Sequence, residues 1–286
     1  MPFFSIIIPS YNRASQIVQT LHSLLEQSFK DFEIIVVDDG STDNTQEIMN
    51  DYCIKHSFIK YEKQSNKGVC TARNNGAKIA KGEYLIFLDS DDLVESSWLK
   101  DFYQGILEDK SLIIYCSLKV KHANGKIEAK DANDPYKNGK NKGFVFSGSW
   151  SIEKAFFFQI GMYDENLKYG ENNELRIRID MMKPKMSIVN QYNFIYNSSS
   201  DGGSKNNQNK IDSILYTLDK HFLYFEKSKR QKIIQLQSAA HTAIKLGMYR
   251  KGHELFRKAL IENKRNLKLW LQFLLSSNAF FVKLVW

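Results

Sequence analysis

Cysteine is scarce in this 286-residue chain, and its three cysteines lie far apart in the sequence. Cys53, Cys70 and Cys116 form no Cys-x-x-Cys pair and have no histidine at metal-ligand spacing. Neither a disulfide framework nor a zinc site is therefore predicted. We expect a reducing, cytoplasmic setting.

Long hydrophobic runs are also missing, since no stretch approaches the roughly 18 apolar residues that a transmembrane helix needs. The first residues, MPFFSIII, include no basic region and no small-residue cleavage site, so we expect no signal peptide. The sequence contains neither GxGxxG nor GxxxxGK[S/T]. The sequence therefore lacks the phosphate-binding loops that are usual in dinucleotide oxidoreductases and in P-loop ATPases, which argues against both classes.

Positive charge is concentrated toward one end of the chain. The net charge is +8, yet residues 209–286 carry 15 Lys and Arg against 5 Asp and Glu, a net +10, which leaves −2 for residues 1–208. A basic terminal region is typical of a protein that meets an anionic partner. No motif that reads nucleic acid accompanies the charge, so a membrane surface is the expected partner.

Apolar runs alternate with helical patterns over the first 110 residues. Short buried strands are predicted at 3–8, 32–37, 58–61 and 84–88. Strands that alternate with helices predict a doubly wound, mostly parallel α/β sheet. Antiparallel additions follow, because Asn124-Gly125 predicts a hairpin between residues 112–120 and 126–129. Further elements are predicted as a strand at 144–146, a helix at 152–159, a helix at 174–181 and a strand at 186–189.

The last part of the chain reads as helix throughout. Residues 197–209 are rich in Ser, Asn and Gly and predict a loop or linker. Helices are then expected at 211–225, 229–246, 249–261 and 267–277. This pattern divides the chain into an α/β domain over 1–208 and a basic helical region over 209–286.

Three carboxylates follow the buried strand Tyr84–Leu88, at Asp89, Asp91 and Asp92. Acids this close repel one another unless a cation lies between them, and their oxygens suit Mg²⁺ or Mn²⁺ shared with a phosphate. The alternative is a solvated acidic turn that caps the next helix, with Asp92 or Ser96 as N-cap.

Other polar groups follow neighbouring predicted strands, and parallel strands bring their carboxyl ends to one edge of the sheet. The ring of Tyr11 could stack on a base, and Asp39 could accept hydrogen bonds from a base or ribose. Arg73 could offer its guanidinium, while the acids would hold a cation on a diphosphate. Together these side chains predict a nucleotide-diphosphate site.

Four segments resemble, in order and spacing, motifs of family 2 glycosyltransferases: SIIIPSYNR, IIVVDDGSTDNT, GVCTARNNGAKIAKGEYLIFLDSDD and IGMYDENLKYGENNELRIRI. The resemblance covers about residues 3–200. It implies a GT-A fold and inverting transfer of a sugar from a nucleotide-diphosphate donor, most often a UDP-sugar. The implied acceptor is a hydroxyl of a growing surface polysaccharide or of another glycan or lipid-linked glycoconjugate.

The resemblance also assigns site residues by position. Residues 1–110 would form the nucleotide-sugar half and residues 111–208 the acceptor side. A DxD motif at Asp89 and Asp91 would hold Mn²⁺ or Mg²⁺, and Asp92 extends this motif without an assigned role. The other residues expected to contact the donor are Pro9, Ser10, Tyr11, Asn12, Asp39, Arg73 and Ser90, together with Asp89 itself.

The catalytic base is where this chain departs from the family pattern. Relatives usually carry Gly-Glu-Asp where this chain has Gly170-Glu171-Asn172, and their Asp resembles the base. An amide does not accept a proton at neutral pH. Three hypotheses follow: Glu171 is the base, Glu174 substitutes for it, or the chain binds the donor and transfers poorly. We favour Glu171, for which a helix N-terminal acid stabilised by the helix dipole is the structural alternative.

A second departure lies at residues 196–200, where many relatives contact the diphosphate or metal with Arg or His. This chain has Tyr-Asn-Ser-Ser-Ser there, which predicts a weaker or more open metal site. A third function class, the nucleotidyltransferases, needs a basic triphosphate-binding loop, and Ser10–Ser15 holds a single cation, Arg13.

The final segment, NLKLWLQFLLSSNAFFVKLVW, mixes aromatic and basic residues. Such a mixture suits an interfacial contact at the inner face of a membrane. The alternative is packing onto the preceding helices, because aromatic stripes at helical spacing are usually core.

Overall fold

The computed structural model describes residues 1–132, 146–198 and 207–276. The chain forms two compact units. Unit 1 comprises Met1–Glu165 and Arg178–Ser200, and unit 2 comprises Asn166–Ile177 and Asp201–Trp286. Helix α6 (Glu171–Met182) begins in unit 2 and ends in unit 1.

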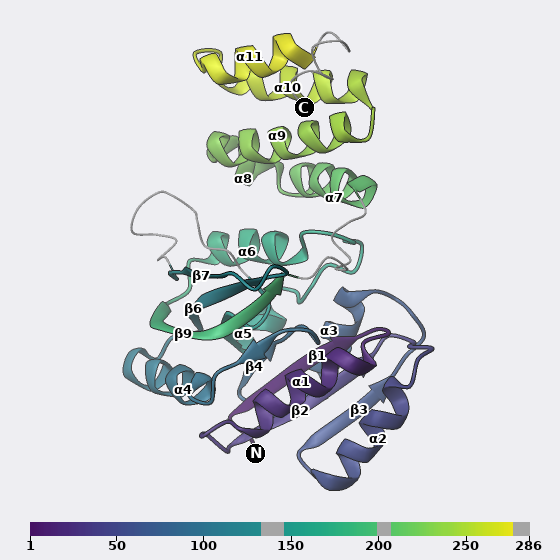
Figure 1. The fold of residues 1–286 in the computed structure, drawn as a ribbon. Helices are drawn as coiled ribbons and strands as arrows, with labels where there is room; N and C mark the ends of the chain where they lie inside the picture. Colours follow the sequence, from purple (N-terminus) through teal and green to yellow (C-terminus); the bar gives the residue numbers. More distant parts are fainter. Residues whose placement is uncertain (133–145, 199–206, 277–286) are drawn as a thin grey trace. The chain divides into compact units, whose positions relative to one another are not determined.

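Within its described residues, unit 1 holds a nine-stranded sheet in the order β3-β2-β1-β4-β8-β6-β9-β5, with β7 paired to β6 (Figure 1). Strands β1 to β4 run parallel, β8 runs antiparallel to both of its neighbours, and β9 is parallel to β6. The predicted mostly parallel sheet with antiparallel additions is confirmed. The strands are β1 (Phe4–Ser10), β2 (Phe32–Asp38), β3 (Ile59–Lys63), β4 (Tyr84–Phe87), β5 (Leu93–Val94), β6 (Ile113–His122), β7 (Ile127–Lys130), β8 (Trp150–Glu153) and β9 (Met186–Ser198).

Helices cover both faces of the parallel half of the sheet. Helix α1 directs Ile17, Leu21 and Leu24 into the core that includes Ile6 and Ile8 of β1. Strands β1, β2 and β4 are buried at every position, as expected for parallel strands enclosed by helices. The helices that lie wholly in unit 1 are α1 (Ala14–Leu25), α2 (Thr45–Lys55), α3 (Val69–Ile79), α4 (Trp98–Asp109) and α5 (Lys154–Gln159).

Helix α3 approaches β1 very closely on the opposite face. A Cβ added at Gly76 would lie 2.5 Å from Cγ2 of Ile7 and 3.2 Å from Cγ2 of Val37. No side chain larger than hydrogen fits between this helix and the strand, so glycine sets the packing distance.

Strand β8 differs from the sequence prediction. The strand expected at 144–146 falls mostly outside the described residues, and the strand that follows is Trp150–Glu153, in a segment expected to be turn and helix. Trp150 and Ile152 are buried and pair this short strand with β4 and β6. Residues 147–149 form the predicted turn, whereas tertiary pairing outweighs the helix signal expected from residue 152 and delays helix α5 to Lys154.

Strand β9 is also longer than predicted, since it runs over 13 residues to Ser198 rather than ending at Val189. The register against β6 jumps from Cys116↔Val189 to Ser117↔Tyr192, so Asn190 and Gln191 form an irregularity. Because two polar residues at a bulge interrupt the apolar pattern, the sequence predicted that the strand ends there. Residues 197 and 198 thus belong to β9, and the part of the expected linker from 199 to 206 lies outside the described residues.

Unit 2 is helical in its described part. Its helices are α7 (Asn207–Lys220), α8 (Phe222–Lys227), α9 (Lys229–Lys245), α10 (Tyr249–Glu262) and α11 (Leu267–Ser276). Helix α11 is described as far as Ser276, and residues 277–286 lie outside the description. None of the helices in the described ranges combines the length and apolar character needed to cross a bilayer.

A buried carboxylate breaks the helix that was expected over 211–225. Glu174 is fully buried and accepts hydrogen bonds from Lys220 Nζ and His221 Nε2, each at 2.8 Å. His221, with φ −110° and ψ 36°, separates α7 from α8. Helix α6 begins at Glu171, three residues earlier than predicted. A charge buried with two partners is costly to disrupt, so this cluster fixes the helix break.

Glu33 ties three strands together at the other end of the sheet. Its Oε2 lies 2.6 Å from Lys60 Nζ, and its Oε1 accepts hydrogen bonds from Ser5 Oγ at 2.7 Å and from the Lys81 N–H at 2.5 Å. Burial raises the pKa of Glu33, but these hydrogen bonds outweigh burial and hold the pKa below its ordinary value of 4.5.

Glu33→Gln is expected to destabilise unit 1 by about 1–3 kcal/mol at pH 7, because a buried charged hydrogen-bond acceptor is lost. The folded pKa is lowered, so the stabilisation is present above the unfolded pKa and is lost as pH falls through 4.5 toward the folded value. Urea unfolding at pH 7 and at acid pH measures this. Glu62→Gln, at an exposed site on β3, is the control. If the difference in free energy of unfolding between the wild type and Glu33→Gln grew toward acid pH, it would contradict the assignment.

Candidate active site

The carboxyl ends of β1, β2 and β4 meet at one edge of unit 1. Ser10 pairs with Asp38 at the end of the β1–β2 ladder, and the Asp39 N–H donates to the Ser10 carbonyl at 2.8 Å. Beside them, the Leu88 N–H donates to the Ile7 carbonyl at 3.0 Å. The structure thus brings the predicted polar strand ends to a common edge, as parallel sheets do.

Residues Asp89–Asp92 form a turn at this edge, named here the acidic turn. Asp89 Oδ1 accepts a 2.7 Å bond from Nη2 of Arg73, a side chain that is 2% exposed. The same Nη2 donates to Ser147 Oγ at 2.8 Å, and the guanidinium lies 5.2 Å from the ring centroid of Tyr163. Arg73 is therefore a buried cation held in one orientation, with its charge directed at Asp89.

The other two acids of the turn are short of positive charge. Burial raises the pKa of the Asp91 carboxyl and the neighbouring Asp89 adds to the rise, whereas Arg13, with Nη2 at 3.9 Å, opposes it. Burial raises the pKa of Asp92 well above its ordinary value, and Asp89 and Asp91 add to that rise. A cation at this turn would stabilise the ionised carboxylates.

The end of β9 contacts the acidic turn directly. Asp92 is 1% exposed, and its Oδ1 accepts a hydrogen bond from the Asn197 N–H at 2.9 Å. Its Oδ2 is buried without a partner. The Asn197 side-chain amide donates to the Asp91 carbonyl at 2.6 Å. Instead of the open loop expected from residue 196 onward, β9 extends to the turn; residues 199 and 200 lie outside the described ranges.

Residues 9–12 close the edge beside β1. Pro9 and Ser10 are buried, whereas Tyr11 is 48% exposed. Asn12 adopts the left-handed φ of +53°; its N–H donates to Ser41 Oγ at 2.9 Å and its Oδ1 accepts from the Thr42 N–H at 2.8 Å. These bonds fix the turn and leave the tyrosine ring available to a flat ligand such as a base.

Asp39 organises the loop in front of α3. Its Oδ1 accepts from Gln64 Nε2 and the Lys67 N–H, and its Oδ2 from the Gly68 N–H, all at 2.8 Å. Gly68 has φ +92°, a conformation that favours glycine. The carboxylate predicted to meet base or ribose is thus 5% exposed and bonded to its own chain, so its direct effect is to shape the loop.

The candidate bases belong to unit 2, whereas the acidic turn belongs to unit 1. Glu171 and Asn172 begin helix α6, where the helix dipole favours an acid. Asn172 Nδ2 lies 3.4 Å from Glu171 Oε1. Glu174, the substitute considered from sequence, is fully buried in its bonds to Lys220 and His221. Burial and pairing leave it unsuited to meet an acceptor, and Glu171 stays the predicted base.

The acidic turn fits a metal that shares its ligands with a phosphate. No group of three or more His, Cys, Asp or Glu side chains in the described residues is arranged to hold a metal by itself. The side chains of Asp89 and Asp91 are 36% and 22% exposed, so two hard oxygen donors face solvent together. Mg²⁺ is commonly bound by one or two carboxylates plus substrate phosphates.

Several residues at this edge were not expected from the sequence. Arg13, Ser147 and Tyr163 contact the acidic turn or its arginine, and Asn197 reaches it from the far side of the sheet. Arg13 and Tyr163 stand inside quoted motifs, SIIIPSYNR and IGMYDENLKYGENNELRIRI, and so carried a signal. The others are brought together by tertiary pairing across more than 50 residues of sequence, as the 74 residues between Arg73 and Ser147 illustrate.

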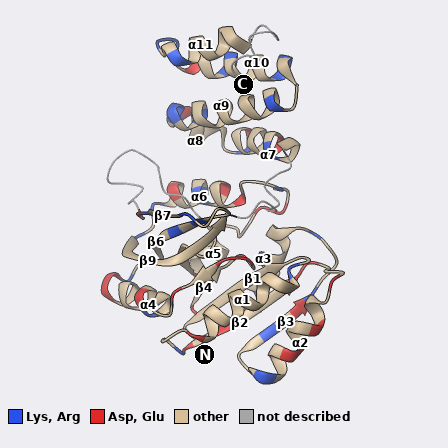
Figure 2. Ribbon diagram, in the orientation of Figure 1, with Lys and Arg blue, Asp and Glu red and all other residues tan. Residues whose placement is uncertain are grey.

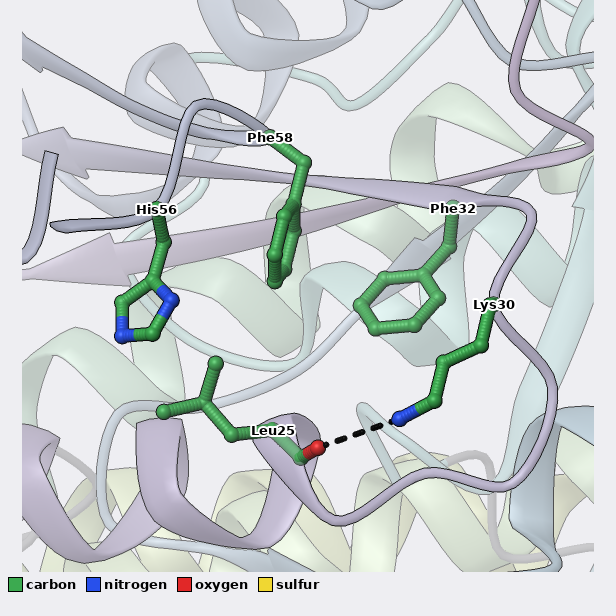
Figure 3. A pocket seen from close by; sticks show the side chains of 5 residues that line it. All are labelled: Leu25, Lys30, Phe32, His56 and Phe58. Atoms are coloured by element: carbon green, nitrogen blue, oxygen red, sulfur yellow. Dashed lines mark hydrogen bonds between the residues drawn. The ribbon is translucent and has the colours of Figure 1, made fainter.

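A separate pocket of about 420 Å³ lies at the opposite, amino end of β2 and β3 (Figure 3). It is lined by Leu25, Lys30, Phe32, His56 and Phe58, and Lys30 Nζ donates to the Leu25 carbonyl at 3.4 Å. The pocket contains none of the residues predicted for donor binding.

Comparison with known sequences agrees with these motifs. Residues 5–162 match the family model described as Glycosyl transferase family 2. The minor teichoic acid biosynthesis protein GgaB of Bacillus subtilis is 30% identical over 246 residues, which cover 80% of this chain and 27% of GgaB. A poly(ribitol-phosphate) beta-glucosyltransferase of Bacillus spizizenii is 32% identical over 213 residues, 69% of this chain and 32% of that protein. The chain thus spans about a third or less of these two relatives.

Solved structures show the same fold. The crystal structure of S. aureus TarS 1–349 matches with a TM-score of 0.64 at 22% identity and covers 96% of this chain and 80% of that one. Its complex with UDP-GlcNAc matches with a TM-score of 0.65 at 21% identity, covering 96% and 79%. The predicted GT-A type fold is confirmed. With more than half of its length matched by the family model, the chain belongs to glycosyl transferase family 2.

Proposed function

We propose that this chain is an inverting glycosyltransferase that moves a sugar from a nucleotide-diphosphate donor, a UDP-sugar, to a hydroxyl of a surface polysaccharide or glycoconjugate. The observation that carries the proposal is the meeting of an exposed Tyr11, an Asp89 paired with a buried Arg73 and a charge-deficient Asp91 at one sheet edge. UDP-GlcNAc and UDP in the TarS crystal structures support a uridine nucleotide, and the teichoic acid relatives support a cell-wall glycan acceptor.

The donor would lie across the ends of β1, β2 and β4. In this arrangement Tyr11 stacks on the base, flanked by Pro9, Ser10 and Asn12, while Asp39 holds the loop that borders the ribose. Arg73 and the turn containing Asp89 and Ser90 face the diphosphate. The contacts of Asp39 and Arg73 support this division, because both side chains are already fixed by hydrogen bonds and would lose little entropy on binding.

Asp89 and Asp91 would hold Mg²⁺ or Mn²⁺. When bound, the metal neutralises the charge that develops on the departing diphosphate. On the acceptor side, Glu171 would take the proton of the attacking hydroxyl as it displaces the nucleotide from the opposite face of the sugar. Asn172 would contact the acceptor as a hydrogen-bonding group that does not take up a proton.

The amide at position 172 favours one other function. A nucleotide-sugar-binding protein with weak or lost transfer would keep the acidic turn and Arg73, yet have no need of a base. A nucleotidyltransferase finds less support, since Arg13, the one cation of Ser10–Ser15, lies against Asp91.

UDP with Mn²⁺ is expected to raise the melting temperature by about 4–5 °C, since a ligand at 100 times its Kd stabilises by roughly 2.7 kcal/mol and unfolding a chain of this length carries an entropy of about 0.6 kcal/mol/K. Asp91→Ala should abolish the Mn²⁺-dependent part of this shift, because one of two carboxylate ligands is lost. Asp51→Ala, at an exposed site on α2, is the matched control. A full Mn²⁺-dependent shift in Asp91→Ala would exclude the metal assignment.

Glu171→Gln is expected to lower kcat for donor hydrolysis or transfer by about 10²- to 10⁴-fold, the contribution of a general base. UDP affinity should be unchanged, which calorimetry can measure. Asn172→Asp distinguishes the alternatives: a large gain of activity over a nearly inactive wild type would favour the binding protein. Asn173→Asp adds the same charge at the next, exposed position and is the control.

A contact with anionic lipid at the inner face of the cell membrane is a second part of the proposal. Helix α11 exposes Leu267, Trp270, Leu271 and Leu274 at helical spacing, with exposures of 84%, 41%, 57% and 57%. No Asp or Glu follows Glu262 in the sequence, and Figure 2 shows basic residues recurring along α9, α10 and α11. Apolar surface flanked by cations suits the interface of an anionic bilayer.

Vesicles containing phosphatidylserine should therefore sediment with the protein, whereas neutral phosphatidylcholine vesicles should not. Leu271→Glu places a charge on the exposed stripe and is expected to lower vesicle binding at least tenfold. Leu107→Glu, at a comparably exposed site on α4, is the control. Equal sedimentation of both variants would exclude α11 as the lipid contact.

A further inference from the structure

Asn197 at the end of β9 donates two hydrogen bonds to two successive residues of the acidic turn. Its backbone N–H donates to Asp92 Oδ1 at 2.9 Å, and its side-chain amide donates to the Asp91 carbonyl at 2.6 Å. The two bonds come from different groups of one residue. Together they fix both the position and the orientation of the peptide that carries the Asp91 side chain.

The turn is held on its other side as well. Thr20 Oγ1, from α1, donates to the Asp92 carbonyl at 2.8 Å, and the Asp92 N–H donates to the Asp89 carbonyl at 3.2 Å. Immediately after the turn, β5 pairs antiparallel with β9 through Leu93 and Val94. The acidic turn is thus fixed between α1 and β9, and Asn197 is the residue of β9 that bonds to it from both backbone and side chain.

The two acids next to Asn197 differ in what they can reach. Asp92 is 1% exposed and serves as an acceptor for β9, so it does not face a ligand in solvent. The Asp91 side chain is 22% exposed and lies at 3.9 Å from Arg13 Nη2. Asn197 therefore bonds to the main chain of Asp91 and to the side chain of Asp92, and it leaves the Asp91 carboxylate open to a ligand.

We propose that Asn197 is a positioning residue that aims the Asp91 carboxylate for binding a divalent cation and a nucleotide diphosphate. This inference rests on the proposed function and deepens it. Groups that orient a metal-ligating carboxylate affect metal affinity by about 10- to 100-fold although they do not touch the ion. Removing the amide frees the Asp91 peptide to rotate and leaves its carbonyl without this donor.

The test measures the Mn²⁺ concentration that gives half of the UDP-dependent thermal shift. Asn197→Ala should raise this concentration by about tenfold or more. Asn190→Ala removes an exposed amide from the same strand, at the bulge, and should leave it unchanged. The melting temperature without ligand is recorded in parallel, because a purely structural amide would lower that temperature and leave the Mn²⁺ requirement where it is.

An unchanged Mn²⁺ requirement in Asn197→Ala would overturn the inference while the proposed function stands. Absence of any UDP and Mn²⁺ shift in the wild type would instead overturn the proposed function, and the inference with it. If Asn197→Ala does not fold, Asn197→Ser keeps a polar side chain and the N–H to Asp92 while removing the amide. The same tenfold rise is expected there, and its absence contradicts the role of the amide.

Discussion

Repulsion among three carboxylates within four residues is the constraint around which unit 1 is organised. Each acid is handled differently: Asp89 pairs with a buried Arg73, Asp91 lies partly exposed near Arg13, and Asp92 is buried against the N–H of Asn197. Because the charges are not fully compensated, the turn supports the proposal that a cation binds there together with an anion. The sheet supplies the rigid edge on which this arrangement is held.

Much of this could be predicted from the sequence, since buried parallel strands leave an unbroken apolar run and their ends leave a polar turn. Asp89 lies at the sheet edge as that argument predicts, and Arg73, a residue of helix α3, bonds to it there. The full length of β9 could not be, because the polar pair Asn190-Gln191 at its bulge imitates a strand end. The partnership of Glu174 with Lys220 and His221 was hidden too, since a buried ion pair between distant segments leaves no periodic signal.

The structure bears differently on the two departures from the family pattern. Near residue 196, the missing Arg or His is accompanied by a strand end that bonds to the acidic turn, so the edge is not simply opened. At residues 171 and 172, the helix start accounts for Glu171 as an N-terminal acid, and the Asn172 amide donates to Glu171. Of these two side chains, only the Glu171 carboxylate can accept the proton of an acceptor hydroxyl at neutral pH.

The glycine at position 76 links packing to electrostatics. It lets α3 lie against Ile7, and Arg73 sits one turn earlier on the same helix. From that helix, Nη2 of Arg73 lies 2.7 Å from Oδ1 of Asp89. The distance between α3 and β1 therefore determines how far the Arg73 side chain must extend to make this ion pair. Even a single methyl group at position 76 would lift the helix and shorten the effective reach of the arginine. The absence of a side chain at Gly76 thereby determines how closely the Arg73 guanidinium approaches the Asp89 carboxylate.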